Sequence, residues 1–138
     1  MPYQIRQTDN LFDIVNLNEL IFPGELIDVS RNIRGWIAYD ENRKPIGFCT
    51  CTDIGYGLLF LSRCGVLPHH RRNGLHKRLL TVREQHARKE DYKMVITYVH
   101  KDNTSSWVNF VKRGYEVYEP EYDYAGKDFL YFRKKLLY

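Results

Sequence analysis

The stretch that begins at Leu58 constrains the fold most, because a strand, a basic loop and a long helix follow one another directly. An apolar run predicts a buried strand, Leu58–Val66, which Pro68 stops, and a helical pattern begins near Leu75. Another strand-like run, Tyr92–Val99, comes after the helix. Two strands joined by one helix are expected to run parallel through a right-handed crossover. The sequence therefore predicts a strand–helix–strand unit with a parallel pair.

The loop before Leu75 is a candidate anion-binding site. The start of a helix leaves about four backbone N–H groups unpaired and carries about half a positive charge, which stabilises an anion. Gly74 lets a ligand approach the backbone, and no Ser, Thr or Asp stands at the N-cap to occupy the free N–H groups. Four cationic side chains surround this position: Arg71, Arg72, Lys77 and Arg78. A ligand is therefore expected to cap the helix.

The spacing within the loop narrows the choice of anion. Neither Gly-x-x-x-x-Gly-Lys-Ser/Thr nor Gly-x-Gly-x-x-Gly occurs, so an ATP loop and a dinucleotide fingerprint are not supported. The run Arg71-Arg72-Asn73-Gly74-Leu75-His76, after Val66-Leu67-Pro68, resembles the Arg/Gln-x-x-Gly-x-Gly/Ala signature of the GNAT superfamily of N-acetyltransferases. In that family the signature holds the pyrophosphate of acetyl-coenzyme A. His76 departs from it, since the family has a small residue there; His76 either alters the approach of the ligand or turns outward to bind phosphate.

A second segment supports the resemblance. Five residues match the family pattern Asn-x-x-Ala-x-x-x-Tyr-x-x-x-Gly-Phe at every interval: Asn103, Ser106, Phe110, Gly114 and Tyr115. Gly114 is expected to end this helix in the left-handed conformation, which glycine adopts at little cost. The order of the elements extends the resemblance to the whole chain.

The fold expected from the resemblance is α/β, a single GNAT-like domain spanning residues 1–138. It implies a mixed, mostly antiparallel sheet of about six or seven strands with a splayed central parallel pair, flanked by about four helices. A chain of 138 residues with 43% hydrophobic content suits one packed domain. Periodicity predicts the remaining elements: strands at Tyr3–Arg6, Trp36–Asp40, Ile46–Asp53, Tyr115–Tyr118 and Phe129–Lys134, and helices from Thr8-Asp9-Asn10 to about Leu20 and over Glu25–Asn32.

The long helix shows one apolar stripe. Its members are Leu75, Leu79, Val82 and His86, with Leu80 and Ala87 adjoining. The charged residues are expected mostly to face solvent: Lys77, Arg78, Arg83, Glu84 and Arg88.

The resemblance implies an acetyl-coenzyme A-dependent N-acetyltransferase that transfers acetyl directly to a primary amine of a protein or small molecule. The pantetheine arm would enter where the central strands splay, and a backbone N–H near Gly65 or Val66 would stabilise the oxyanion. Asn103 would contact the pantetheine arm or fix the loop. Cys64 would line the site, because no adjacent base for a nucleophile is readable. The coenzyme-binding residues implied are Cys64, Gly65, Val66, Arg71, Arg72, Asn73, Gly74, Leu75, His76, Lys77, Asn103, Ser106 and Phe110.

The acid and base of the family are missing from their usual positions. Phe110 stands where many members carry a tyrosine that protonates the thiolate, and Phe60 where some carry a glutamate base. Tyr98 stands where N-terminal acetyltransferases of ribosomal proteins often have glutamate. The substitutes open to this chain are Tyr98 through a water, His100, Glu25 and Asp28. Weak activity, unassisted departure of the thiolate and loss of catalysis are all compatible with these replacements.

The acceptor side is expected between the loop around Glu25 and the hairpin loop of Tyr122 and Tyr124, whose carboxylates and tyrosines suit a cationic amine. A non-catalytic or weakly active coenzyme-binding interaction protein is one alternative. A nucleic-acid-directed enzyme acting on aminoacyl-tRNA is another; it would use the basic loop and Arg133-Lys134-Lys135. Nucleic acid is disfavoured as a partner because the sequence has no aromatic platform or reading motif for it.

Composition also bears on the cysteine state, on metal binding and on the cellular location. The three cysteines read as reduced thiols, and no Cys-x-x-Cys or His-x-x-x-His spacing predicts a metal site. No signal peptide and no apolar run near the ~18 residues of a membrane span is readable, which predicts a cytoplasmic protein without a membrane partner. The positive residues behind the net charge of +4 concentrate at the proposed coenzyme loop and helix and at the C-terminus, and a coenzyme with several phosphates explains much of this charge. Aromatic-rich terminal strands leave a homodimer open.

Overall fold

The computed structural model describes residues 2–27, 29 and 32–136. In chain order the elements are β1 (Gln4–Thr8), α1 (Leu11–Ile21), β2 (Ile33–Tyr39), β3 (Pro45–Asp53), β4 (Leu58–Val66), the short 3₁₀ helix η1 (Pro68–His70), α2 (Leu75–Lys89), β5 (Met94–His100), α3 (Thr104–Lys112), β6 (Glu116–Tyr118) and β7 (Phe129–Lys135). The predicted strand Leu58–Val66 and the predicted helix start at Leu75 are confirmed without a shift.

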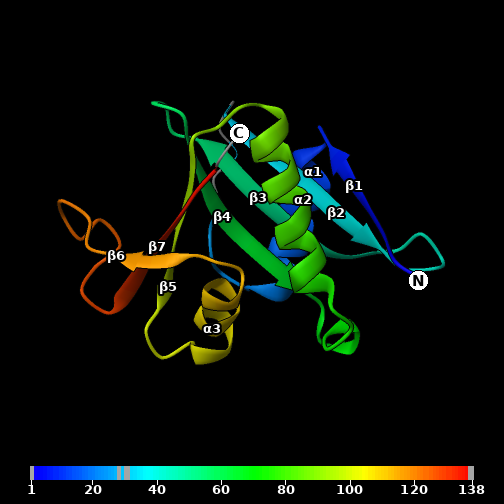
Figure 1. Ribbon diagram of the computed structural model, residues 1–138. Coiled ribbons are helices and arrows are strands. Elements are labelled where there is room, and N and C mark those ends of the chain that lie inside the picture. Colours follow the sequence, from blue (N-terminus) through cyan, green and yellow to red (C-terminus); the bar gives the residue numbers. More distant parts are fainter. Residues whose placement is uncertain (1, 28, 30–31, 137–138) are drawn as a thin grey trace.

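All seven strands form one sheet in the order β1-β2-β3-β4-β5-β7-β6. The pair β4 and β5 is parallel, and every other neighbouring pair is antiparallel. Helices α1 and α2 cover opposite faces of the sheet, and α3 lies below the ends of the central strands (Figure 1). The α/β fold with a mixed sheet and a central parallel pair is thus confirmed, with three α-helices in the described residues where about four were expected.

The second short helix expected over Glu25–Asn32 is wrong for the part of it that the structure describes. Residues 25–27 and 29 are not helical, and Asp28, Ser30 and Arg31 lie outside the described residues. The side chain of Asn18 donates to the carbonyl of Glu25 at 2.7 Å, which ties the chain after α1 back to that helix. Gly24 makes the preceding turn with a φ of 80°.

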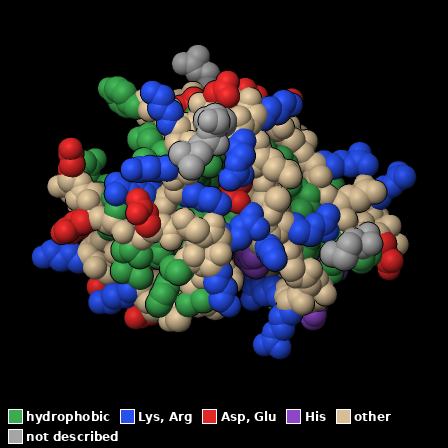
Figure 2. Space-filling view, in the orientation of Figure 1, with side chains coloured by type: hydrophobic (Ala, Val, Ile, Leu, Met, Phe, Trp, Pro, Cys, Tyr) green, Lys and Arg blue, Asp and Glu red, His purple; other side chains and the backbone are tan. Residues whose placement is uncertain are grey.

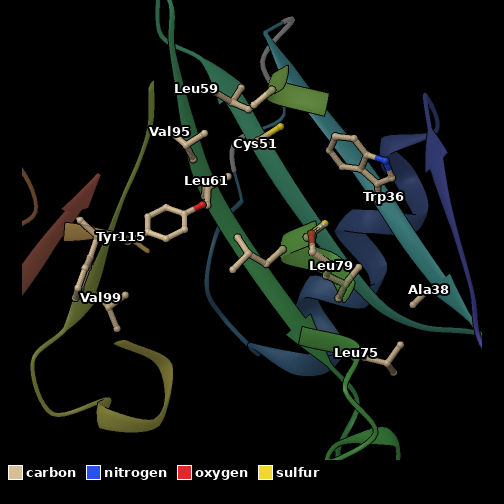
Figure 3. Close-up of a cluster of buried hydrophobic side chains, with 14 of the residues drawn as sticks. Trp36, Ala38, Cys51, Leu59, Leu61, Leu75, Leu79, Val95, Val99 and Tyr115 are labelled. Atoms are coloured by element: carbon tan, nitrogen blue, oxygen red, sulfur yellow. Dashed lines mark hydrogen bonds between the residues drawn. The ribbon is translucent and has the colours of Figure 1, made fainter. Parts of the chain in front are cut away.

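A hydrophobic core fills the space between α2 and the sheet (Figure 3). Leu75 and Leu79 of α2 are buried there, together with side chains of β3, β4 and β5 such as Cys51, Leu61 and Val95. A smaller cluster packs α1 on the other face of the sheet. Its buried members are Ile14, Leu17, Ile37 and Phe48. Four members of the apolar stripe predicted for the long helix are buried, namely Leu75, Leu79, Leu80 and Ala87, and the other two, Val82 and His86, are half-buried.

Two charged residues of α2 that were expected to face solvent are buried, so this expectation is wrong. Arg83 is 4% exposed and Glu84 is 2% exposed. Arg83 donates to the carbonyls of Leu79 (3.2 Å) and Thr50 (3.3 Å). Helical periodicity marks the apolar stripe but does not detect a charge that is buried because distant residues pair with it.

Glu84 is the centre of a buried polar network. Its carboxylate accepts hydrogen bonds from Arg113, from the hydroxyl of Tyr115 (2.8 Å) and from Lys134 (3.1 Å). Lys134 also donates to the carbonyl of Arg113 at 2.8 Å. Burial alone would raise the pKa of Glu84, but these hydrogen bonds outweigh it and hold the pKa below its ordinary value. The network joins α2 to the end of α3 and to β7.

We expect Glu84→Gln to lower the free energy of unfolding by about 2–3 kcal/mol, because it leaves two partly buried cations without a counterion. Urea denaturation measures this, and Glu90→Gln, exposed at the end of the same helix, should change stability by less than ~0.5 kcal/mol.

The same residue predicts a pH dependence. Because the folded pKa is lowered, the stabilisation is fully present above the unfolded carboxyl pKa of about 4.3 and is lost as the pH falls through the folded value. Glu84→Gln should therefore flatten the acid limb of the stability curve. An acid limb equal to that of the unsubstituted protein would contradict the assignment.

Candidate functional site

The parallel pairing of β4 and β5 ends after the first third of β4. The ladder between β4 and β5 ends at Phe60 and Ile96, after three residue pairs. Beyond this point β4 continues to pair with β3 as far as Val66, while β5 pairs with β7. The hydroxyl of Thr97 donates to the carbonyl of Leu61 at 3.0 Å and makes the last link. The resulting separation, here called the splay, opens toward the starts of α2 and α3 (Figure 1).

The splay exposes main-chain donors of β4. The N–H of Leu67 bonds the carbonyl of Ile46 at 2.8 Å, and Gly65 is paired with Phe48 two residues earlier. Antiparallel ladders alternate, so Cys64 and Val66, on either side of Gly65, direct their N–H groups away from β3 and into the splay. Of the two donors expected near this place, the N–H of Val66 faces the splay and the N–H of Gly65 faces β3.

The basic loop lies at the end of β4, and two residues with a left-handed backbone conformation shape it. Arg72 has a φ of 66° and Gly74 a φ of 74°. Helix α2 then begins at Leu75 with no side chain capping it, so the N–H groups of its first turn point into the loop. A Cβ placed on Gly74 would meet nothing within 4 Å, which means that this backbone faces open space. Lys and Arg side chains gather on this face around His side chains (Figure 2).

Tyr3 holds the loop, a role the sequence did not reveal. Its hydroxyl contacts Nδ1 of His70 at 3.0 Å and accepts a hydrogen bond from the side-chain amide of Asn73 at 3.2 Å. Arg78 reaches the carbonyl of Tyr3 at 3.4 Å. Asn73 also bonds the carbonyls of His70 and Arg71, so its amide shapes the loop.

The cationic residues of the loop differ in what they contact. Arg71 donates through Nε to the carbonyl of Val66 at 2.9 Å and so closes one main-chain acceptor at the splay. Arg72 and Lys77 are exposed, while Leu75 is buried in the core. Leu75 can therefore offer a ligand only its backbone.

His76 turns toward the sheet, to Cys64. Its Nδ1 lies 3.3 Å from the thiol sulfur of Cys64. Burial raises the pKa of the Cys64 thiol, and burial, with the positive charges of Arg83 and Arg71, lowers the pKa of His76. A base thus stands beside Cys64, where none was readable, but both groups are neutral at pH 7. A neutral thiol is a poor nucleophile.

Helix α3 starts at the end of β5 and flanks the splay. Asn103 precedes its first residue, and the Asn103 carbonyl accepts from the N–H groups of Ser106 and Trp107, both at 3.2 Å. Phe110 is half-buried, with its ring 5.0 Å from that of Tyr115 and 5.9 Å from that of Phe132. Gly114 ends this segment with a φ of 89°, as predicted.

An aromatic cluster surrounds Tyr98 on the opposite face of the sheet from Val95 and Val99. The Tyr98 ring lies 5.5 Å from Phe60 across the end of the parallel ladder, 5.2 Å from Phe129 and 6.0 Å from Tyr124. Tyr122 joins the cluster through Tyr124, at 6.1 Å. His100 lies beside Phe129 at 5.2 Å, and its Nδ1 accepts from the N–H of Asp102. Tyr98, Tyr122 and Tyr124 are thus brought together.

Glu25 is placed beside β4 by Arg63, which sequence reasoning did not single out. The two side chains form an ion pair at 3.4 Å, and Arg63 also donates to Asn18 at 3.3 Å. The Arg63 guanidinium lies 4.8 Å from the centre of the Phe22 ring. An alternating strand pattern gives no sign that a basic residue in β4 would pair with the loop after α1.

The basic tail is largely engaged within the fold. Arg133 pairs with Glu116 at 2.7 Å, and Lys134 belongs to the Glu84 network. In the described part of the chain, no three His, Cys, Asp or Glu side chains lie close enough together to hold a metal ion. None of the helices described has the length and the apolar content that crossing a bilayer requires.

Comparisons with known proteins agree with this geometry. Residues 5–115 match the profile of the acetyltransferase (GNAT) family. Curated protein sequences gave no significant match. Several solved structures share the fold over nearly the whole chain.

Three of these structures can be compared directly. An IAA acetyltransferase from Bacillus cereus has a TM-score of 0.82 and 15% identity, covering 97% of this chain and 99% of its own. The PaiA N-acetyltransferase from Thermoplasma acidophilum in complex with coenzyme A has a TM-score of 0.74 and 17% identity, with 99% and 100% covered. A GNAT family acetyltransferase from Elizabethkingia anophelis with acetyl-CoA bound has a TM-score of 0.73 and 15% identity, with 98% and 99% covered.

The state of Cys64 can be tested by alkylation. We expect iodoacetamide at about pH 7.5 to modify Cys64 at least tenfold more slowly than glutathione, because the raised pKa leaves little thiolate. Mass spectrometry of the peptide that carries Cys64 follows the reaction. His76→Asn is the control and should not slow it, since a neutral imidazole does not activate the thiol. A Cys64 that reacts faster than glutathione would contradict this assignment.

Proposed function

Because the chain belongs to the acetyltransferase (GNAT) family, we propose that it transfers an acetyl group from acetyl-coenzyme A directly to a primary amine of a protein or a small molecule. The observation that carries the proposal is the splay between β4 and β5, whose free main-chain donors lie next to an uncapped helix start. Two structures that share the fold contain coenzyme A or acetyl-coenzyme A. These features supply the two things that a long phosphorylated thioester needs, an anion site and an extended edge for its arm.

The coenzyme would bind in two parts. Its pyrophosphate would lie at the N–H groups of the first turn of α2, with Arg72 and Lys77 as the exposed cations. Its pantetheine arm would pair with the β4 edge at Cys64 and Val66, where no neighbouring strand competes. Gly74 leaves open space over the loop for this ligand. His76, turned to Cys64, does not fill that space.

Transfer is proposed to occur in one addition and one elimination. The lone pair of the amine nitrogen attacks the thioester carbonyl carbon, and the carbonyl oxygen becomes an oxyanion. One of the free β4 N–H groups would donate to this oxygen, which is typically worth about 3 kcal/mol of barrier. The C–S bond then breaks, the coenzyme leaves as a thiolate, and the ammonium proton must be taken up. Cys64 takes no part as a nucleophile, consistent with its raised pKa.

The acceptor would enter on the side of the aromatic cluster. Tyr98 stands at the end of the parallel ladder, and Tyr122 and Tyr124 extend from it, so their ring faces can contact a cationic amine. Glu25 adds a carboxylate next to Arg63. Tyr98 through a water and His100 remain the proposed proton acceptors. A cytoplasmic location and a homodimer also stay predictions.

A non-catalytic coenzyme-binding role is the second candidate, because Phe110 lacks the hydroxyl that would protonate the thiolate. A nucleic-acid-directed role has less support, since Arg133 and Lys134 form ion pairs within the fold. Calorimetric titration with coenzyme A tests binding. Release of its thiol, followed with a chromogenic disulfide across a panel of primary amines, tests transfer. Binding without thiol release from any amine would favour the non-catalytic role, and absence of binding would remove both.

The loop assignment predicts a selective effect at Gly74. Gly74→Ala forces a left-handed backbone on a residue with a Cβ and should reduce stability by about 1–2 kcal/mol. The added methyl should also crowd the pyrophosphate and weaken coenzyme A binding by about tenfold. Gly55→Ala is the matched control, since Gly55 has a φ of 87°, open space at its Cβ and a position at the far end of β4. Gly55→Ala should lose stability but keep its affinity for coenzyme A. Equal affinities of the two variants for coenzyme A would contradict the loop assignment.

Phe110→Tyr tests the missing acid. The substitution adds one hydroxyl to a half-buried ring on α3. General-acid assistance is typically worth ~100-fold or more, so kcat should rise if thiolate expulsion limits the rate, with KM for acetyl-coenzyme A unchanged. Phe12→Tyr, which adds the same hydroxyl to an exposed ring on α1, serves as the control. An unchanged kcat for Phe110→Tyr would show that another group supplies the proton or that expulsion is not limiting.

A further inference from the structure

A β-bulge interrupts β4 within the splay, just before Cys64. Cys49 pairs with Cys64 and Cys51 with Leu61, so Thr50 alone opposes the two residues Ser62 and Arg63. A bulge breaks the ladder locally and bends the strand that carries the extra residue. It also leaves main-chain polar groups without their regular partners, and buried groups of this kind need substitutes.

Two buried side chains supply those substitutes. In a regular ladder the N–H of Arg63 would bond the carbonyl of Thr50, but it bonds the Thr50 hydroxyl instead, at 3.2 Å. The Thr50 carbonyl accepts from the Arg83 guanidinium at 3.3 Å. Thr50 is 0% exposed and Arg83 4% exposed, so water cannot readily replace either bond.

Arg83 is an unusual donor to the Thr50 carbonyl, because burying a guanidinium without a counterion is costly. Within the described residues it has no carboxylate partner, and its bonds go to the carbonyls of Leu79 and Thr50. Its charge therefore brings no ion pair that would explain why it is buried. What it provides is a donor that reaches from α2 to the bulge.

We propose that Arg83 and Thr50 are positioning residues for acetyl transfer, because they hold the β4 bulge that aims the free backbone N–H groups into the splay. The inference rests on the proposed function. The bulge immediately precedes Cys64, whose N–H is one of these donors. Since Arg83 belongs to the helix that begins at the basic loop, the same helix fixes both the anion site and the direction of the strand edge.

The bulge also fixes the acceptor side. Its residue Arg63 uses its N–H for Thr50, while its side chain reaches Asn18 and Glu25 on the α1 face. Asn18 in turn holds the carbonyl of Glu25. A shift of the bulge would therefore move the thioester donors and the loop beside the acceptor together.

The test uses pairs of variants in the full chain. Thr50→Val removes the hydroxyl at nearly constant volume, and Thr50→Ser keeps it. We expect Thr50→Val to lower kcat by about 100-fold, the loss that a misplacement of about 1 Å can bring, with the affinity for coenzyme A within about threefold. Thr50→Ser should stay within about threefold of the unsubstituted kcat. Arg83→Met should lower kcat similarly, and the double variant little further, because both changes act on one bulge.

Amide measurements decide the inference even if no acceptor amine is found. Hydrogen exchange at the Arg63 N–H should be faster in Thr50→Val than in Thr50→Ser. Coenzyme A should shift the amide resonances of Cys64 and Val66 less in Thr50→Val than in the unsubstituted protein. Equal exchange rates together with equal shifts would overturn the positioning role. Absence of acetyl transfer by the unsubstituted protein, with these amide differences present, would count against the proposed function alone.

Discussion

The early end of main-chain pairing between β4 and β5 is the constraint on which the rest of the structure depends. After Phe60 and Ile96, the edge of β4 that faces β5 is paired with no strand of the described residues. Unpaired backbone groups inside a protein are costly, so such an edge persists only where side chains or a ligand satisfy it. Thr97 and Arg71 close two carbonyls of β4 from the side of the splay, at Leu61 and Val66. The N–H groups that remain form the extended edge on which the proposed coenzyme site depends.

Local signals in the sequence predicted the elements around this edge well. The apolar run Leu58–Val66 and the periodic helix from Leu75 both reflect contacts with the nearest layer, which periodicity measures directly. Two expectations failed because non-local partners decided the outcome. Glu84 is buried because Arg113 and Lys134 reach it from far along the chain. Residues 25–27 and 29 are not helical, and the side chain of Asn18 holds the carbonyl of Glu25.

In the candidate site too, features set by local sequence were predicted, and features set by distant residues were not. The loop Arg71–Lys77 was predicted from its spacing, since an anion site at a helix start needs a glycine and free N–H groups in sequence order. The structure confirms the helix start at Leu75 without a side-chain cap, and the anion site itself stays a prediction. The residues that hold the loop and the strand in place were not found. Tyr3 reaches the loop from the residue just before β1, and the bulge at Arg63 is held from β3 and α2. A bulge adds one residue to a strand without changing its composition, so the sequence pattern of β4 does not predict it.

The position of β7 in the sheet has a consequence for how the chain is made. The seventh strand in sequence lies between β5 and β6, so it is an interior strand. During synthesis, the edge of β5 that pairs with β7 stays open until Phe129–Lys135 has left the ribosome. Until then the Glu84 carboxylate also lacks its ion pair with Lys134. Pairing of strands far apart in sequence is slow, because the entropy of loop closure is lost before the stabilising contacts between the strands can form. The half of the sheet that forms the splay is therefore completed last, and nascent chains shorter than this strand present an exposed edge that chaperones and other nascent chains can bind.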